Sequence, residues 1–172
     1  MGATQPTAVL SHWNTLVEGI QQSSDQFYDE TQSNLDAHRI KDVKLERVKL
    51  SEGGLFSANR EYLQIKHREF VYHLCAAPYG NGFFVSSWLG EFEHGFVAWL
   101  ATIPYLGAIV RLFRSFFKPL TYYRFDTAQM FHSVVHGAAT KALDDLLQAK
   151  GRKPLTDVER KPVMRDLFDR FK

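Results

Sequence analysis

The chain has 172 residues, of which 45% are hydrophobic and 14% aromatic, and its formal net charge at pH 7 is +2. That length suits one compact domain with a hydrophobic core of its own, and so small a charge does not by itself indicate a nucleic-acid-binding protein. The single cysteine, Cys75, excludes an intramolecular disulfide and a cysteine zinc site, which favours a reducing compartment.

The first residues show no export or lipidation signal. Residues 1–13 lack the basic start and the continuous apolar run of a secretory signal. Pro6 stands where a myristoylation sequence needs Ser or Thr. We therefore expect a cytoplasmic protein, which could also attach peripherally to the inner membrane.

Residues 1–40 are predicted to form a long N-terminal helix. Apolar side chains recur at helical spacing, and Trp13, Ile20 and Phe27 are seven apart. Polar residues interrupt the second half of this stripe, so it is narrow. Such a helix either packs across a sheet of the same chain or pairs with a second copy. The apolar positions are Leu10, Trp13, Leu16, Val17, Ile20, Phe27 and Leu35.

Residues 41–93 are predicted to form a four-stranded antiparallel meander. Val43 and Leu45 fall on one face of the first strand and Val48 and Leu50 on the other. That strand therefore contains a bulge or is partly covered on both faces. The expected strands are 42–51, 61–66, 69–77 and 82–89, and the positive φ angles of the last hairpin turn are expected at Asn81-Gly82.

Residues 94–172 are predicted to be helical. Asp126 is the expected N-cap of a long helix. Thr156 and Glu159 have the spacing of a capping box, and Pro162 should divide the last segment into two short helical pieces. The whole chain, residues 1–172, is thus interpreted as a single α+β domain with a long N-terminal helix, a four-stranded antiparallel meander and a helical C-terminal half.

An apolar basic segment, residues 96–118, is the most unusual feature of the sequence. No Asp or Glu occurs between His94 and Phe125. On a helical wheel, the apolar residues from Leu106 to Lys118 fill an arc of roughly 160°, and the basic residues cluster on the opposite side. Three surfaces could cover the apolar arc: the protein's own core, a lipid interface or a groove on a partner protein.

An interfacial helix needs this separation, because aromatic rings reach the acyl boundary while cations meet anionic headgroups. A bilayer-spanning helix is not expected, since the uncharged run is too short and contains Pro104 and Gly107. The residues expected to contact a membrane or partner are Trp99, Ile103, Tyr105, Ile109, Phe113, Phe116 and Phe117, with Arg111, Arg114 and Lys118.

The C-terminal third contains a set of short sequences, at 122–127, Met130-Phe131, Val135-His136, Lys150-Gly151 and 159–162. In these residues it resembles a segment of uncharacterised bacterial proteins, a family to which no activity is attached. The relatives carry long apolar insertions before this segment that look membrane-spanning, whereas this chain is much shorter there. The resemblance therefore leaves surface association open and argues against insertion.

Two sets of residues could carry chemistry. His132 and His136 lie on one helix face, but a zinc protease would need Glu where this chain has Ser133, and no third ligand is evident. They remain weak metal candidates. His73 and Cys75 share a strand face, but a catalytic thiolate needs partial exposure and the neighbouring residues are apolar. Asp144 is expected to be solvated.

The strands also carry aromatic residues that could stack on bases, although the glycine-rich aromatic pattern of RNA-binding sheets is missing. We expect them to form core, and nucleic acid is disfavoured as a partner. No catalytic residue, cofactor or small-molecule substrate is predicted. The aromatic residues concerned are Tyr62, Phe70, Tyr72, Phe83, Phe84 and Trp88.

The function most consistent with these features is a non-enzymatic interaction protein. It would dock on the cytosolic membrane surface, or on a membrane-bound partner, through the segment 96–118. An alternative is a self-associating structural module, a homo-oligomer that buries the same apolar segment. The third hypothesis is a metal-dependent enzyme that uses His132 and His136.

Overall fold

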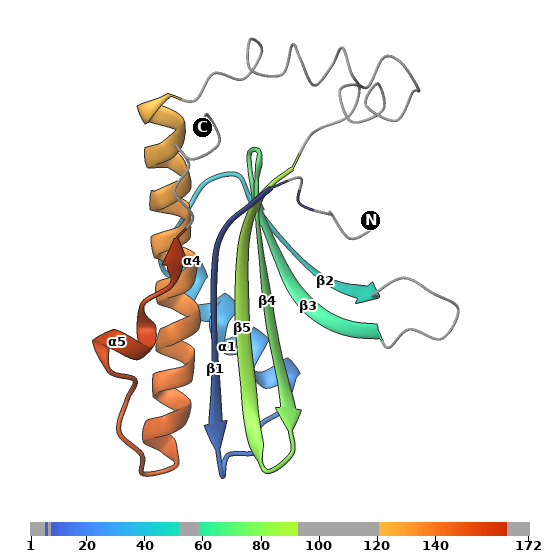
Figure 1. The fold of residues 1–172 in the computed structure, drawn as a ribbon, viewed down its shortest axis with the longest axis vertical. Helices are drawn as coiled ribbons and strands as arrows, with labels where there is room; N and C mark the ends of the chain where they lie inside the picture. The colour runs from blue at the N-terminus through green and yellow to red at the C-terminus, as the bar shows by residue number, and fades with distance from the viewer. Residues whose placement is uncertain (1–5, 7, 52–58, 93–120, 165–172) are drawn as a thin grey trace.

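The computed structural model describes residues 6, 8–51, 59–92 and 121–164, and these form a six-stranded antiparallel sheet with helices (Figure 1). The strand order across the sheet is β2-β3-β4-β5-β1-β6. Helices α1 and α4 pack against each other and against β4, and together with the sheet they enclose one core. The elements are β1 (Ala8–Glu18), α1 (Ser24–Asp36), β2 (Val43–Ser51), β3 (Asn59–His67), β4 (Phe70–Tyr79), β5 (Gly82–Glu91), α4 (Tyr122–Ala149), α5 (Asp157–Arg160) and β6 (Val163–Met164).

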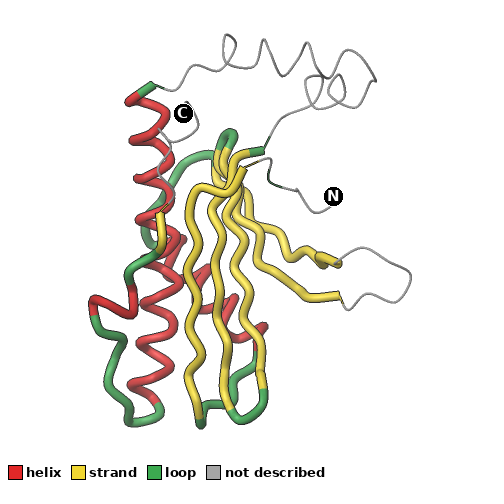
Figure 2. Tube along the Cα trace, viewed as in Figure 1, coloured by secondary structure: helices red, strands yellow, loops and turns green. Residues whose placement is uncertain are grey.

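The predicted long N-terminal helix is wrong. The chain instead forms β1, turns at Gly19 with a φ of 69°, and continues into α1 (Figure 2). β1 pairs with β5 along its whole length, with a register shift between Val9 and Ser11. Trp13 and Phe27 are buried as the apolar stripe suggested, but one lies in a strand and the other in a helix.

The four-stranded sheet is also wrong, because β1 and β6 extend it to six strands. The predicted strands correspond to β2–β5, which are antiparallel neighbours in chain order. β1 lies beside β5, with Ala8 opposite Glu91 and Glu18 opposite Gly82. β6 then pairs with β1 over only two residues. Neither addition could be found from hairpin spacing, since both strands join the sheet from distant parts of the chain.

β2 resolves the choice between a bulge and two covered faces. Its pairing with β3 is continuous from Val43 to Ser51, so the strand has no register shift. Leu45 packs against the helix-covered core, whereas Val48 lies on the opposite face and is only 5% exposed. Both faces of the strand are therefore partly covered, with Lys44 exposed on one face and Arg47 on the other. The β4–β5 turn also differs from expectation, because Gly80 supplies the positive φ of 58°.

Helix α4 begins earlier than predicted, and the segment that follows α5 is a strand instead of a helix. The N-cap of α4 is Thr121, whose hydroxyl accepts a hydrogen bond from the backbone N–H of Arg124, so Asp126 lies inside the helix. Thr156 and Glu159 form the predicted capping box. After Pro162 the chain forms β6 instead of a second helical piece, because the edge of β1 is available for pairing there.

Candidate functional site

The ten predicted membrane- or partner-contacting residues lie outside the described residues. All of them, from Trp99 to Lys118, belong to residues 93–120. The structure describes the two flanks of this segment, which are the end of β5 and the start of α4. The geometry of these flanks therefore defines the candidate site.

An ion-pair cluster ties the two flanks together. Arg124 Nε lies 3.1 Å from Glu69 Oε1, and Arg124 Nη2 lies 3.2 Å from Glu91 Oε1. The backbone N–H of Phe92 donates to the carbonyl of Glu69 at 2.9 Å. We call Arg124, Glu69 and Glu91 the Arg124 clamp. The end of β5 and the start of α4 therefore lie together at one end of the described structure, beside the turn between β3 and β4.

The Arg124 clamp is shielded from solvent. The exposed fraction of the side chain is 15% for Arg124, 10% for Glu91 and 28% for Glu69. An arginine that contacts two carboxylates at this burial is held in one orientation, because its planar guanidinium presents several donors at once. The clamp thus fixes the first turn of α4 against the end of the sheet.

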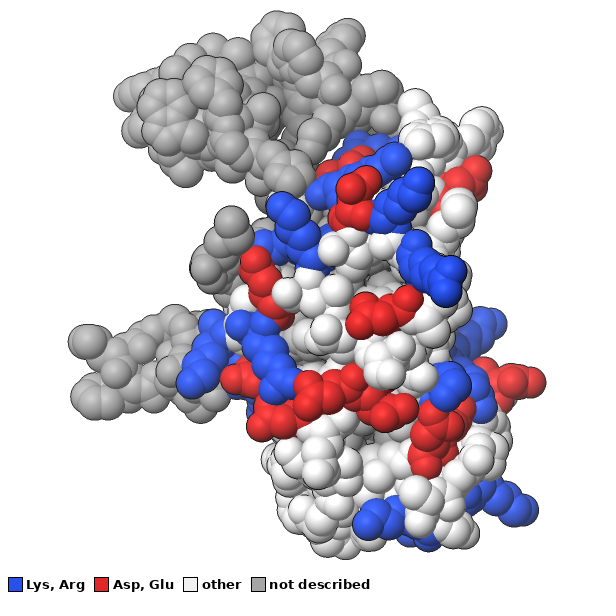
Figure 3. All heavy atoms as spheres, turned by 180° about the vertical axis from the view of Figure 1, so that it is seen from behind, with Lys and Arg blue, Asp and Glu red and all other residues white. Residues whose placement is uncertain are grey.

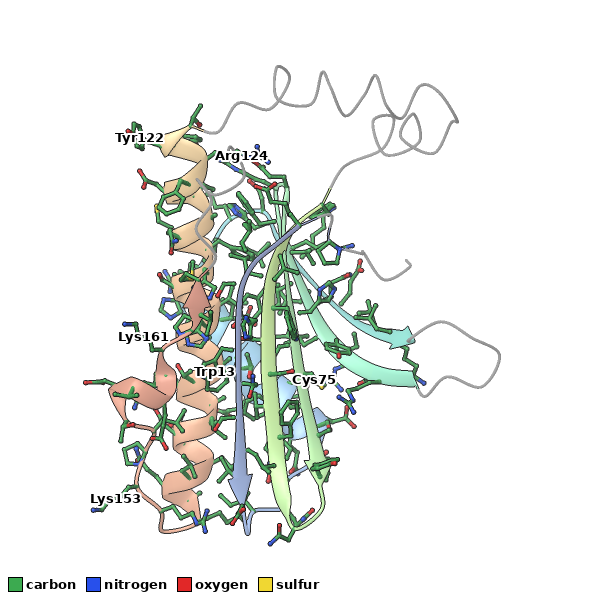
Figure 4. All side chains as sticks on the ribbon, viewed as in Figure 1. Trp13, Cys75, Tyr122, Arg124, Lys153 and Lys161 are labelled. Atoms are coloured by element: carbon green, nitrogen blue, oxygen red, sulfur yellow. The ribbon has the colours of Figure 1, made fainter. Side chains whose placement is uncertain are left out.

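Exposed aromatic side chains lie next to the clamp. Tyr122 is 83% exposed and Tyr123 is 69% exposed, and Met130 two turns further along α4 is 70% exposed. Figure 4 shows Tyr122 and Arg124 at the same end of α4. Arg68 Nη1 donates to the hydroxyl of Tyr123 at 3.0 Å, and this hydrogen bond lowers the pKa of the Tyr123 phenol.

Charge on the rear face is mixed in sign. Figure 3 shows basic and acidic side chains interspersed over the described part of that face. Arg47, for example, forms ion pairs with Asp25 and Asp29 of α1. A face of this kind does not generate the strong single-sign field that nucleic-acid binding requires.

His132 and His136 are stacked, with ring centroids 5.3 Å apart, and both are buried. His136 Nε2 donates to the carbonyl of Arg160 at 2.7 Å, and its Nδ1 lies 3.3 Å from the hydroxyl of Tyr72. His132 Nε2 lies 3.2 Å from Ser11 Oγ. Burial lowers the pKa of His132 to about 4 and also lowers that of His136. Three of the four ring nitrogens thus contact protein groups, as expected of neutral packing histidines.

The histidines belong to a polar cluster that docks the C-terminal segment, which sequence reasoning missed. Asp144, expected to be solvated, is only 6% exposed. Its carboxylate accepts from the backbone N–H of Leu155 at 2.8 Å and pairs with Arg160 at 2.8 Å. Trp13 Nε1 donates to the carbonyl of Glu159 at 2.6 Å. The signal available in the sequence was Asp144 on the apolar side of its predicted helix, with Arg160 later in the chain as a possible partner.

Cys75 and His73 share a strand face, but their surroundings do not suit a nucleophile. Cys75 is fully buried, and burial raises the pKa of its thiol. His73 Nε2 donates to Gln64 Oε1 at 3.0 Å, and burial with the nearby charge of Lys66 lowers the pKa of His73 to about 4. A buried, protonated thiol is a poor nucleophile.

The aromatic strand residues do not share one surface. Phe70, Tyr72 and Phe83 are buried in the helix-covered core. Trp88 belongs to the opposite face, is 40% exposed and stacks on His12 with ring centroids 5.1 Å apart. An extended platform for base stacking therefore does not form from these six residues.

Within the ranges that the structure describes, no group of three or more His, Cys, Asp or Glu side chains could hold a metal ion. None of the helices in the same ranges combines the length and apolar character needed to cross a bilayer. Comparisons of the chain with protein-family models, with curated proteins and with solved structures found no match.

Proposed function

We propose that the protein docks on an anionic, cytosolic membrane surface through residues 93–120, with the α+β domain as its scaffold. The observation that carries the proposal is the Arg124 clamp. It holds the two flanks of the segment at one end of the molecule. A segment whose flanks meet can contact an external surface without unravelling the sheet or α4.

The composition of the segment favours an anionic lipid surface over a neutral one. Arg111, Arg114 and Lys118 fall on one side of the helical wheel, and the segment contains no Asp, while Glu93 at its start is the only acid. Each basic residue near an anionic surface contributes about 1 kcal/mol, and the three together about 3 kcal/mol. The phenylalanines add apolar burial. Because the electrostatic share is screened, binding should weaken as salt rises.

Co-sedimentation with vesicles of phosphatidylserine and phosphatidylcholine tests the proposal. The wild-type protein should pellet at low salt, and the double variant Arg111→Glu/Arg114→Glu should lose at least tenfold in affinity. The matched control is Lys150→Glu/Lys153→Glu, which makes the same change in charge at two exposed residues. Lys153 lies at the opposite end of α4 from Tyr122 (Figure 4).

The outcomes are distinct. Equal loss of binding in both double variants would mean that only net charge matters, and no salt-sensitive pelleting of the wild-type protein would rule out the proposal. A dimer that forms without lipid, and that dissociates on Phe113→Ser/Phe117→Ser, would support the self-associating module instead. Size-exclusion chromatography with light scattering measures this mass.

A further inference from the structure

α4 presents an apolar surface at its N-terminal end, beside the Arg124 clamp. Tyr122, Tyr123 and Met130 are 83%, 69% and 70% exposed. We call these three residues the α4 apolar patch. They are the most exposed large hydrophobic residues of the helix, whereas its second half buries Leu143 and Leu147 in the core. The exposure is therefore concentrated beside the Arg124 clamp.

The helix geometry places the patch on one side. Tyr123 and Met130 are seven residues apart, so they lie within about 20° of each other around the axis and about 10 Å apart along it. The inner side of the same turns is anchored, because Ala128 and Phe131 are buried. The patch cannot rotate into the core without losing that packing.

The chemistry of the patch suits the headgroup layer of a membrane. Tyrosine has an apolar ring and a polar hydroxyl, and it is enriched at the level where lipid tails meet water. Arg68 Nη1 donates to the Tyr123 hydroxyl at 3.0 Å, which places a guanidinium at the polar end of that side chain. The positive charge of that guanidinium, whatever other groups it contacts, favours a nearby phosphate or carboxylate headgroup.

We infer that the α4 apolar patch, with Arg68 beside it, contacts the headgroup layer of the anionic membrane on which residues 93–120 dock. This inference rests on the proposed function and extends it to a second, described contact element. The first two turns of α4 then lie against the membrane surface, with Tyr122 and Tyr123 deepest. Asp126, exposed on the same side of the helix, opposes the anionic lipids.

The buried cysteine makes a site-specific test possible. Cys75 is fully buried and burial raises the pKa of its thiol, so a maleimide fluorophore should react with an introduced surface cysteine instead. The polarity-sensitive label is placed at Tyr122→Cys and at Met130→Cys. The control is Val158→Cys in α5, where the native side chain is 83% exposed, as it is at Tyr122. Wild-type protein treated with the same maleimide controls for reaction at Cys75.

On adding phosphatidylserine vesicles, emission at position 122 should shift to the blue and rise at least twofold, with a smaller change at 130 and none at 158. Pelleting of the labelled protein without a change at 122 would refute the contact and leave the proposed function intact. Failure of the wild-type protein to pellet would instead remove the proposed function and this inference together. A blue shift that rises with protein concentration and needs no lipid would assign the patch to a second copy.

A charge variant gives an independent measure. Asp126→Asn removes an anion from the docking side and should raise the affinity for anionic vesicles about fivefold. The matched control Asp145→Asn removes an equal charge from the far part of α4 and should leave affinity unchanged. Equal affinities for Asp126→Asn and wild-type protein would count against contact by this face of the helix.

Discussion

Replacing Arg124 with Met tests the structural basis of the proposed function. The change removes the cation that pairs with Glu69 at 3.1 Å and Glu91 at 3.2 Å while keeping most of the side-chain volume. Breaking a fully buried ion pair costs about 3–5 kcal/mol, because the remaining charge stays desolvated. The side chains of Glu91 and Glu69 are 10% and 28% exposed, so we expect a loss of about 2–3 kcal/mol.

Urea denaturation followed by far-ultraviolet circular dichroism measures the free energy of unfolding. Arg124→Lys is the control, because it keeps the charge but lacks the planar guanidinium that reaches both carboxylates, and it should cost about 1 kcal/mol. The double variant Arg124→Met/Glu91→Gln should recover part of the loss, since the more buried of the two carboxylates then carries no charge, while Glu69 still does. A change of less than about 0.5 kcal/mol in Arg124→Met would show that the flanks are not held by this contact.

Two further predictions concern the docked C-terminal segment. Asp144→Ala leaves the backbone N–H of Leu155 without its acceptor and Arg160 without its carboxylate. The free energy of unfolding should therefore fall by about 2–4 kcal/mol. The control Asp145→Ala, which removes an exposed ion pair, should lower it by less than about 1 kcal/mol. Because the pKa of His132 is about 4 in the folded protein and 6.5 ordinarily, the unfolded chain binds more protons between these values, and stability falls as pH drops from 6.5 toward 4. Replacing His132 with Gln should reduce the loss of stability between pH 7 and pH 5 by about 2 kcal/mol. The control Ser133→Ala should lose as much stability over this range as the wild-type protein. If His132→Gln also lost as much as the wild-type protein, the assigned burial of His132 would be contradicted.

Local signals in the sequence located several elements correctly. The stretch from Val43 to Ser51 and the aromatic run from Phe70 are strands, and the Thr156–Glu159 spacing is a capping box. These features depend on residues close together in the chain, such as alternation along a strand or a hydroxyl three residues before a carboxylate. No distant partner is needed to recognise them.

β1 shows where local reasoning failed. Its inward side chains include Ser11 and Thr15 as well as Trp13 and Val17, so polar residues hide the alternation that marks a strand. The register shift between Val9 and Ser11 disturbs it further. Leu16, by contrast, is apolar and 46% exposed. The remaining apolar residues then have helical spacing by coincidence.

The candidate site shows a second limit of the sequence. The sequence alone shows the charge pattern of Arg111 and Arg114, but it does not show which carboxylates pair with Arg124. Glu69 and Glu91 belong to two different hairpins, and many other carboxylates were equally plausible partners. The prediction that Asp144 is solvated failed for the same reason, because its burial depends on Leu155 and Arg160 folding back across α4.

By itself, the sequence determined the strand character of β2–β5, the cap of α5 and the apolar, cationic composition of residues 96–118. Only the tertiary structure decided that residues 8–18 form a strand and that Arg124 joins the end of β5 to the start of α4. The reason is physical. Capping and alternation are settled by neighbours in the chain, whereas backbone pairing at a sheet edge and the choice of a desolvated ion partner depend on which distant groups the fold brings within hydrogen-bonding distance.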